Sequence, residues 1–260
     1  MLFPVVVSCG GPAAPKPAAP APNCAPLPAA SSEPERNGTT LQADVQRRPL
    51  SPASLQFAAP ELGEHVMSAD PRSFRVHVVT DAVGPGVIGI DLALDAGRPR
   101  RSPLAETEIA LGELLSEGAE LMPGAHWLFA APVLASGLVP RAASGGAAKA
   151  RRFFVGKTSD EAAGPSGAVW LRKPEGSYNG PKGSESMLFD AFVFSALGAE
   201  LDTPCTITLR SPAVSGQLRL ASPFVLHEVP SGVYEVSVSA TAASTSTTLF
   251  TVNRELVGGS

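Results

Sequence analysis

The sequence contains no long apolar run, and this absence argues against one class of protein. No stretch of its 260 residues approaches the roughly 18 consecutive apolar residues that a membrane-spanning helix requires. Positive charge is not in excess either, because 20 Lys and Arg stand against 24 Asp and Glu, for a formal net charge of −4. Proteins that bind nucleic acid need a basic surface for the phosphate backbone. We therefore expect no nucleic-acid partner.

The usual local signatures of catalysis and metal binding are also missing. There is no Gly-x-Ser-x-Gly nucleophile elbow and no Asp-rich calcium loop. Gly84–Gly89 has the letters of a dinucleotide fingerprint, but that motif needs a following helix, and here we expect a turn and then a strand. We predict no catalytic residue, no metal and no cofactor. The four histidines are scattered, without the spacing of metal ligands: His65, His77, His126 and His227.

Cysteine is scarce, and one of the three cysteines suggests a lipid anchor. Val6-Val7-Ser8-Cys9 resembles a bacterial lipobox, in which the cysteine thiol takes a diacylglyceryl group. The apolar stub before it is shorter than the roughly 7–15 residues of a signal-peptide core and has no basic residue, so we interpret residues 1–9 as a signal remnant with its true start upstream, or as a chance match. Cys24 and Cys205 either pair in an oxidising compartment or remain as a linker thiol and a core thiol.

The segment after Cys9 has the composition of a tether. Residues 10–54 are rich in Pro, Ala and Ser and almost free of aromatics. Such a chain buries too little apolar surface to offset the entropy lost on ordering. We predict a disordered, semi-extended Pro/Ala-rich linker. With Cys9, it indicates a membrane-anchored lipoprotein of the bacterial cell envelope, in the periplasm or at the cell surface.

The rest of the chain contains a diverged tandem duplication. Residues 55–79 align without a gap with residues 169–193, and later landmarks follow in the same order. The segment 123–128 matches 231–236, and Phe153 matches Phe250 near the end of each copy. Matching landmarks in one order indicate two copies of a folding unit. We place the copies at residues 55–160 and 165–257.

Each copy has the pattern of an antiparallel β-sandwich. Apolar and polar residues alternate in 74–80 and 88–94, as expected for half-buried strands, and Gly-Pro-Gly turn chemistry separates them. We expect a further strand near 109–111 and a surface loop insertion near 139–149. The predicted fold is all-β, with two tandem Ig-like modules. Strands of the second copy are expected at 188–195, 205–210, 217–220, 233–240 and 247–252.

Four aromatic residues are candidates for a ligand surface or an interdomain surface: Trp127, Phe129, Trp170 and Tyr178. In the second copy Tyr234 and Val236 alternate with polar residues and should face the core. The duplication then turns Trp127 and Phe129 outward, where exposed apolar groups usually mark a contact. They either cover a loop of their own module, such as the insertion near 139–149, or pack against the second module, or meet an external partner. We favour an intramolecular contact, and expect Trp127→Ser to loosen the two modules.

Asp190 is the residue for which we predict a structural role. Alternation places it with Leu188, Phe192 and Phe194, on the face expected to be the core. A buried carboxylate must be hydrogen-bonded or neutralised. We expect it to accept backbone N–H groups from the turn at 177–180.

Three segments of the second copy carry a resemblance to a known family. They are Trp170-Leu-Arg-Lys-Pro-Glu-Gly-Ser-Tyr-Asn-Gly180, Met187-Leu-Phe-Asp-Ala-Phe192 and Pro230-Ser-Gly-Val-Tyr-Glu-Val236. They resemble the Pro-x-Gly-x-Tyr, Leu-Asp-Phe and Pro-x-Gly-x-His/Tyr motifs of a family of uncharacterised bacterial secreted proteins and lipoproteins with tandem repeats. The resemblance covers most of 169–254 and more faintly 55–157, and the first copy departs from it at Val76, where the family has Asp. It implies an Ig-like fold and an envelope location, and no chemistry.

Three functions remain open on the sequence. The leading one is a non-enzymatic structural or interaction module of the envelope, whose partners are the membrane, through its lipid, and an envelope protein or polysaccharide. The second is a carbohydrate- or peptidoglycan-binding module, and the third is a hydrolase or hydrolase inhibitor without a local motif. Exposure of the tryptophans separates the first two, because an exposed aromatic platform favours sugar binding and burial between modules favours a structural role.

Overall fold

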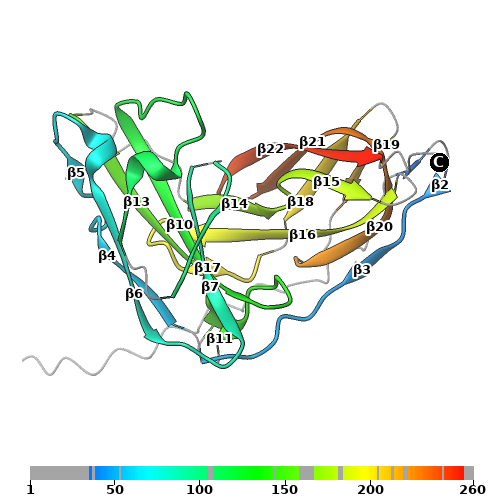
Figure 1. Cartoon of the computed structure of the whole chain (residues 1–260), viewed down its shortest axis with the longest axis horizontal. Coiled ribbons are helices and arrows are strands. Elements are labelled where there is room, and N and C mark those ends of the chain that lie inside the picture. Colours follow the sequence, from blue (N-terminus) through cyan, green and yellow to red (C-terminus); the bar gives the residue numbers. More distant parts are fainter. Residues whose placement is uncertain are drawn as a thin grey trace, which may run out of the picture. The chain divides into compact units, whose positions relative to one another are not determined.

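The computed structural model describes the chain from residue 35 to residue 254, with short gaps. The described residues are 35–36, 39–52, 54–95, 97–104, 108–142, 145–157, 167–180, 184–203, 205–211, 214–218, 222–241 and 243–254. The predicted lipobox with Cys9, and Cys24 in the expected linker, lie outside them. All regular structure in the described part is β-strand apart from two short 3₁₀ helices, η1 (Pro71–Ser73) and η2 (Leu111–Leu114). The all-β prediction is confirmed (Figure 1).

The first sandwich has a three-stranded and a five-stranded sheet. Its core lies between them and includes Phe57, Val78, Leu92, Leu128 and Phe153. The strand predicted near 109–111 is β9, and the Gly-Pro-Gly segment is a turn that leads into β7, as expected. The strand order of the three-stranded sheet is β4 (Ser54–Ala59), β6 (Arg75–Ala82), β9 (Glu108–Ala110). The order of the five-stranded sheet is β5 (His65–Val66), β13 (Lys149–Val155), β10 (Gly124–Leu134), β7 (Val87–Leu94), β8 (Arg100–Ser102). A separate pair is formed by β11 (Arg141–Ala142) and β12 (Gly145–Gly146).

The second sandwich also has two sheets around one core. Leu171 and Phe189 come from one sheet, Leu209 and Val236 from the other, and all four are buried in a single cluster. The first sheet is β14 (Gly167–Lys173), β16 (Ser184–Ser195), β20 (Phe224–Pro230), β3 (Ala43–Val45), with β17 (Glu200–Leu201) beside β16. The other is β15 (Gly176–Gly180), β22 (Ala243–Arg254), β21 (Gly232–Ala240), β18 (Thr206–Arg210), β19 (Val214–Leu218), β1 (Glu35–Arg36), β2 (Thr39–Thr40).

The last part of the expected linker belongs to the second sandwich, which corrects the boundary at residue 54. We call residues 41–52 the strap. Leu41 is buried in the second core, β3 pairs with β20, and the Gln46 N–H donates to the carbonyl of Pro223 at 2.8 Å. The Pro/Ala-rich composition ends before this segment, whose apolar residues and free N–H groups can join a sheet. The first sandwich is thus inserted between β3 and β14 of the second.

The gapless alignment of the two copies is wrong by one residue in its second half. Leu55 and Phe57 correspond to Val169 and Leu171, as predicted. However, Phe57 pairs with Val78, whereas Leu171 pairs with Ala191, so this strand of the second copy is displaced by one position. Since side chains alternate along a strand, a one-residue slip exchanges the faces. The core of the second sandwich therefore receives Phe189 and Ala191, and the outer face carries Asp190, Phe192 and Phe194.

A candidate site at the junction of the two sandwiches

The outward aromatics of the first sandwich lie against the outward aromatics of the second. Leu128 and Ala130 of β10 enter the first core, while Trp127 and Phe129 alternate with them and point the other way. The Phe129 ring stacks on Trp170, with centroids 5.4 Å apart, and lies 5.5 Å from Phe194. Trp127 is 7% exposed and Trp170 is 0% exposed. Such ring pairs contribute about 0.5–1.5 kcal/mol each beyond the burial of their area.

The insertion of the first copy covers this aromatic cluster. We expected residues 139–149 to form a surface loop, but Val139, Ala147 and Ala148 are buried in the same cluster as Trp127 and Trp170. Small and apolar side chains let the segment lie close to large rings, which a solvent-facing loop does not require. The segment is therefore part of the junction.

A glycine brings the main chains of the two sandwiches into contact. Gly198 follows β16 with φ +78°, and its carbonyl accepts the N–H of Ala150 in β13 at 3.0 Å. A Cβ at this position would meet the Ala150 carbonyl oxygen at 1.8 Å. Both the backbone conformation and the lack of space exclude a side chain here.

Arginine and aspartate side chains form a buried ionic cluster across the junction. Arg172 of β14 donates from Nε to Asp190 Oδ2 at 2.8 Å, and from Nη1 to Asp91 Oδ2, on β7 of the first sandwich, at 2.7 Å. Its third nitrogen, Nη2, donates to the carbonyl of Gly137 at 2.6 Å. Arg48 of the strap donates to Asp190 Oδ1 at 2.5 Å, and Arg101 binds Asp91 through two nitrogens.

These contacts determine the charge states in the cluster. Burial alone would raise the pKa of Asp91, but the hydrogen bonds and positive charges of Arg101 and Arg172 outweigh it and hold that pKa below its usual range. Burial alone would lower the pKa of Arg172, and the charges of Asp190 and Asp91 outweigh it and raise that pKa. Both groups are therefore ionised at neutral pH. A buried charge is stable only when it is paired in this way.

Asp190 is buried, as expected, but on the other face and with other partners. It lies on the outer face of β16 and accepts from Arg172, Arg48 and Ser222, rather than from the turn at 177–180. Sequence reasoning missed Arg172 and Asp91. Their signal was a charged residue inside an apolar strand, at 169–173 and at 88–94.

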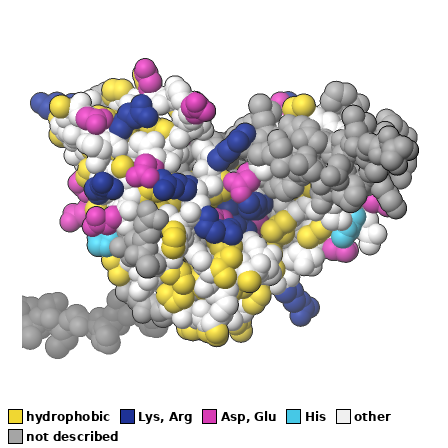
Figure 2. All heavy atoms as spheres, viewed as in Figure 1, with side chains coloured by type: hydrophobic (Ala, Val, Ile, Leu, Met, Phe, Trp, Pro, Cys, Tyr) yellow, Lys and Arg dark blue, Asp and Glu magenta, His cyan; other side chains and the backbone are white. Residues whose placement is uncertain are grey.

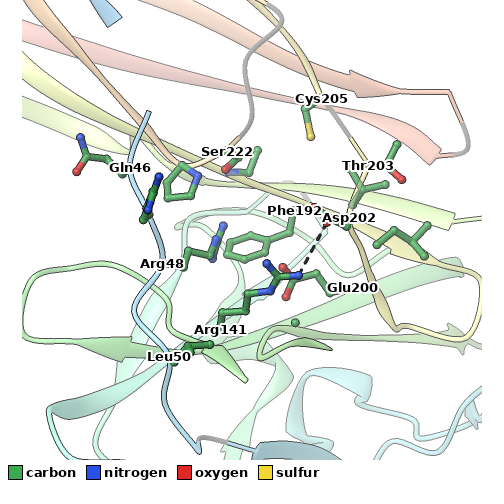
Figure 3. Close-up of a pocket in the computed structure, with 16 residues that line it drawn as sticks. Gln46, Arg48, Leu50, Arg141, Phe192, Glu200, Asp202, Thr203, Cys205 and Ser222 are labelled. Carbon is green, nitrogen blue, oxygen red and sulfur yellow. Dashed lines mark hydrogen bonds and ion pairs between the residues drawn. The ribbon is translucent and has the colours of Figure 1, made fainter. Parts of the chain in front are cut away.

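The strap closes one side of a cavity of about 700 Å³ beside this cluster. Gln46, Arg47, Arg48 and Leu50 of the strap line one side, and Phe192 and Glu200 also border the cavity. Arg48 lies over the Phe192 ring, 4.1 Å from its centroid (Figure 3). Cys205, the core thiol, also borders the cavity; it is buried, forms no disulfide among the described residues, and its pKa is raised to about 11 by burial.

A hydrogen-bonded row of Ser186, His227 and Asp44 crosses three adjacent strands, β16, β20 and β3. The Ser186 hydroxyl lies 3.0 Å from His227 Nδ1, and His227 Nε2 lies 2.9 Å from Asp44 Oδ2. These residue types occur in hydrolase triads. The row, however, lies on the outer face of the sheet and borders none of the cavity, so its clear effect is to tie the strap to the sheet.

Two of the predicted site residues, Tyr178 and Cys9, cannot be related to the junction. Tyr178 lies in β15, but its side chain is not among those that the structure describes, and Cys9 lies outside the described residues. Among the described residues, no group of three or more His, Cys, Asp or Glu side chains could hold a metal ion. None of the described helices is long and apolar enough to span a bilayer. On the face shown in Figure 2, basic and acidic side chains are interspersed.

Comparison with known proteins gives structural likenesses alone. No protein-family model matches the sequence, and no curated protein matches it significantly. Solved structures that match include the fibronectin(III)-like modules of Clostridium thermocellum CbhA, with 15% identity, TM-score 0.26, and coverage of 79% of this chain and 97% of that one. The Ig1-2 module of the Drosophila receptor protein tyrosine phosphatase DLAR has 10% identity and a TM-score of 0.26, with coverage of 78% of this chain and 100% of that one. The D00-D0 domain of intimin has 13% identity and a TM-score of 0.26, with coverage of 76% of this chain and 96% of that one. At this level of similarity, the description of the fold rests on the strand pairing of the chain itself.

Proposed function

We propose that this chain is a non-enzymatic lipoprotein of the bacterial cell envelope, in which two β-sandwiches act together as one structural and interaction unit. The finer parts of this proposal, the lipid on Cys9 and the envelope location, rest on the lipobox and on the resemblance of the second copy to secreted repeat proteins. A lipid anchor with a Pro-rich spacer serves to hold a folded unit at a distance from a membrane.

The observation that carries the structural role is the burial of Trp127, Phe129 and Trp170. A sugar-binding platform needs aromatic rings that are open to solvent, and these three are buried against one another. Their contact, the ionic cluster and the main-chain bond at Gly198 all join the two sandwiches. These contacts hold the two sandwiches in one fixed orientation, which suits a protein that must present surfaces of both to a partner.

The strap supports a specific mode of attachment. The chain passes from the proposed tether into the second sandwich through β1, β2 and β3, continues past Arg48 and the ionic cluster, and then enters the first sandwich at β4. The tether is therefore attached directly to the second sandwich and reaches the first sandwich only through the strap. If the chain were cut between β13 and β14, the first sandwich would stay attached to the second, because the strap joins it covalently to β3 and β3 pairs with β20.

Lipid labelling tests the anchored part of the proposal. The gene, with the region upstream of the codon for Met1 retained, is expressed in a bacterial host with an alkyne-labelled palmitate. We expect the label and detergent-phase partitioning for wild type and for Cys24→Ser, which is the matched control, and expect both to be lost in Cys9→Ser. A wild-type protein that remains unlabelled and aqueous would remove the anchor from the account.

A further inference from the structure

The cavity beside the ionic cluster has an unused cationic group in its wall. The side chain of Arg48 is 10% exposed, and its Nη2 is bound to Asp190. Its Nη1 is buried and has no hydrogen-bond partner among the described residues. A buried donor without a partner costs about 1–3 kcal/mol, so a native structure rarely keeps one without a reason.

A second arginine borders the same space and is only weakly held. Arg141 of β11 is 58% exposed, and its Nη2 is 3.9 Å from Asp202 Oδ2, too far for a hydrogen bond. Figure 3 shows the guanidinium groups of Arg48 and Arg141 directed into the cavity, with Phe192 and Glu200 beside them. Two guanidinium groups with free donors suit a carboxylate, which they bind in a bidentate manner.

The same cavity also has acceptors for a cation. The carboxylate of Glu200 accepts the N–H of Ala148 at 3.1 Å and has further lone pairs, while Asp202 stands at the rim. Burial raises the pKa of Glu200, although Arg48 and the Ala148 bond oppose this shift. A positively charged donor from a ligand would stabilise the ionised form of Glu200.

The cavity therefore offers guanidinium donors for a negative group and carboxylate acceptors for a positive group, at a volume within the range of small-ligand sites. We propose that it binds a small zwitterion, a free amino acid or a dipeptide, with the carboxylate at Arg48 and Arg141 and the ammonium at Glu200 and Asp202, in place of the loose 3.9 Å pair of Arg141 and Asp202. The ring of Phe192 also borders the cavity and offers an apolar contact to a small side chain. The ligand joins the strap, the insertion and the second sandwich, so binding also stabilises the junction.

This inference rests on the proposed non-enzymatic role but is independent of the lipid anchor. Titration calorimetry on the full chain uses four probes: the dipeptide Ala-Ala, Ala-Ala amide, which lacks the carboxylate, N-acetyl-Ala-Ala, which lacks the ammonium, and free alanine. We expect Ala-Ala to bind, and each capped probe to bind at least about tenfold more weakly, since each lacks one of the two charges that the side chains of the cavity would pair. Free alanine that binds as well as Ala-Ala identifies a free amino acid as the ligand, and weaker binding identifies a dipeptide.

Variants test the residues. Arg141→Gln should weaken Ala-Ala binding about tenfold or more. Arg210→Gln is the matched control, because Arg210 is also exposed, lies 3.9 Å from a carboxylate, Glu235, and does not border the cavity. Arg48→Lys keeps the charge near Asp190 while losing the planar fork, and should weaken binding without unfolding the chain. Equal affinity for Ala-Ala and both capped probes, no binding up to about 10 mM, or equal effects of the Arg141 and Arg210 variants would overturn the site. Hydrolysis of Ala-Ala would instead refute the non-enzymatic role and leave the site intact.

Discussion

Replacing Asp190 with Ala should cost the protein a large part of its stability. The carboxylate is fully buried, and its removal takes one anionic partner from Arg172 and the anionic partner from Arg48. Breaking one side of a buried ion pair costs about 3–5 kcal/mol. Arg172 keeps Asp91 and the Gly137 carbonyl, so we expect the lower end, about 3 kcal/mol. For a chain of this size that corresponds to a melting temperature lower by about 6–12 °C.

Differential scanning calorimetry and urea unfolding of the full chain measure this loss. Asp202→Ala, at an exposed carboxylate loosely paired with Arg141, is the matched control and should change little. In an Arg48→Met background, Asp190→Ala should cost clearly less, because the buried charge that loses its ionic partner is gone. A melting curve of Asp190→Ala superimposable on wild type would show that this cluster does not hold the junction.

Three further outcomes follow from the same structure. Because the pKa of Asp91 is lowered in the folded protein, its contribution to stability is present above the unfolded pKa of about 4 and is lost as the pH falls through the folded pKa. The urea midpoint should therefore drop between pH 5 and pH 2 by less in Asp91→Asn than in wild type, and equal drops would contradict this. With Cys9 and Cys24 changed to Ser, the thiol of Cys205, whose pKa is about 11, should react with a disulfide reagent only after unfolding, so fast reaction of the native protein would be inconsistent with its burial. Leu41→Ala should lower the unfolding free energy by about 2–5 kcal/mol, because the strap is part of the second core, and a silent substitution would return residues 41–52 to the linker.

The sequence predicted the fold well where patterns are local. Alternation located most strands, and the duplication correctly turned Trp127 and Phe129 away from the first core. It failed at Asp190, because a one-residue difference between the copies falls in the connection before β16, where sequence gives no register. The pairing partner of a strand depends on the whole fold, and so the faces of 188–194 were exchanged.

The candidate site itself was beyond local sequence reasoning. Arg48 lies in a segment whose neighbours are rich in Pro and Ala, and its partner Asp190 is 142 residues further along the chain. Asp91 and Arg172 meet across 81 residues. Composition indicates a segment that does not fold alone, but it does not show that residues 41–52 pair with an existing sheet, since that stabilisation comes from β20 and not from the segment itself.

The measurement that most directly tests the central claim, that a buried junction holds the two sandwiches as one unit, is the distance between them in solution. Spin labels are placed at Leu62 in the first sandwich and Val233 in the second, both exposed, with Cys9 and Cys24 changed to Ser. We expect one narrow distance distribution by double electron–electron resonance, retained in the surface control Met122→Ser and broadened in Trp127→Ser while both sandwiches stay folded. A broad distribution in the protein without the Trp127 substitution, or an unchanged narrow one in Trp127→Ser, would contradict the claim.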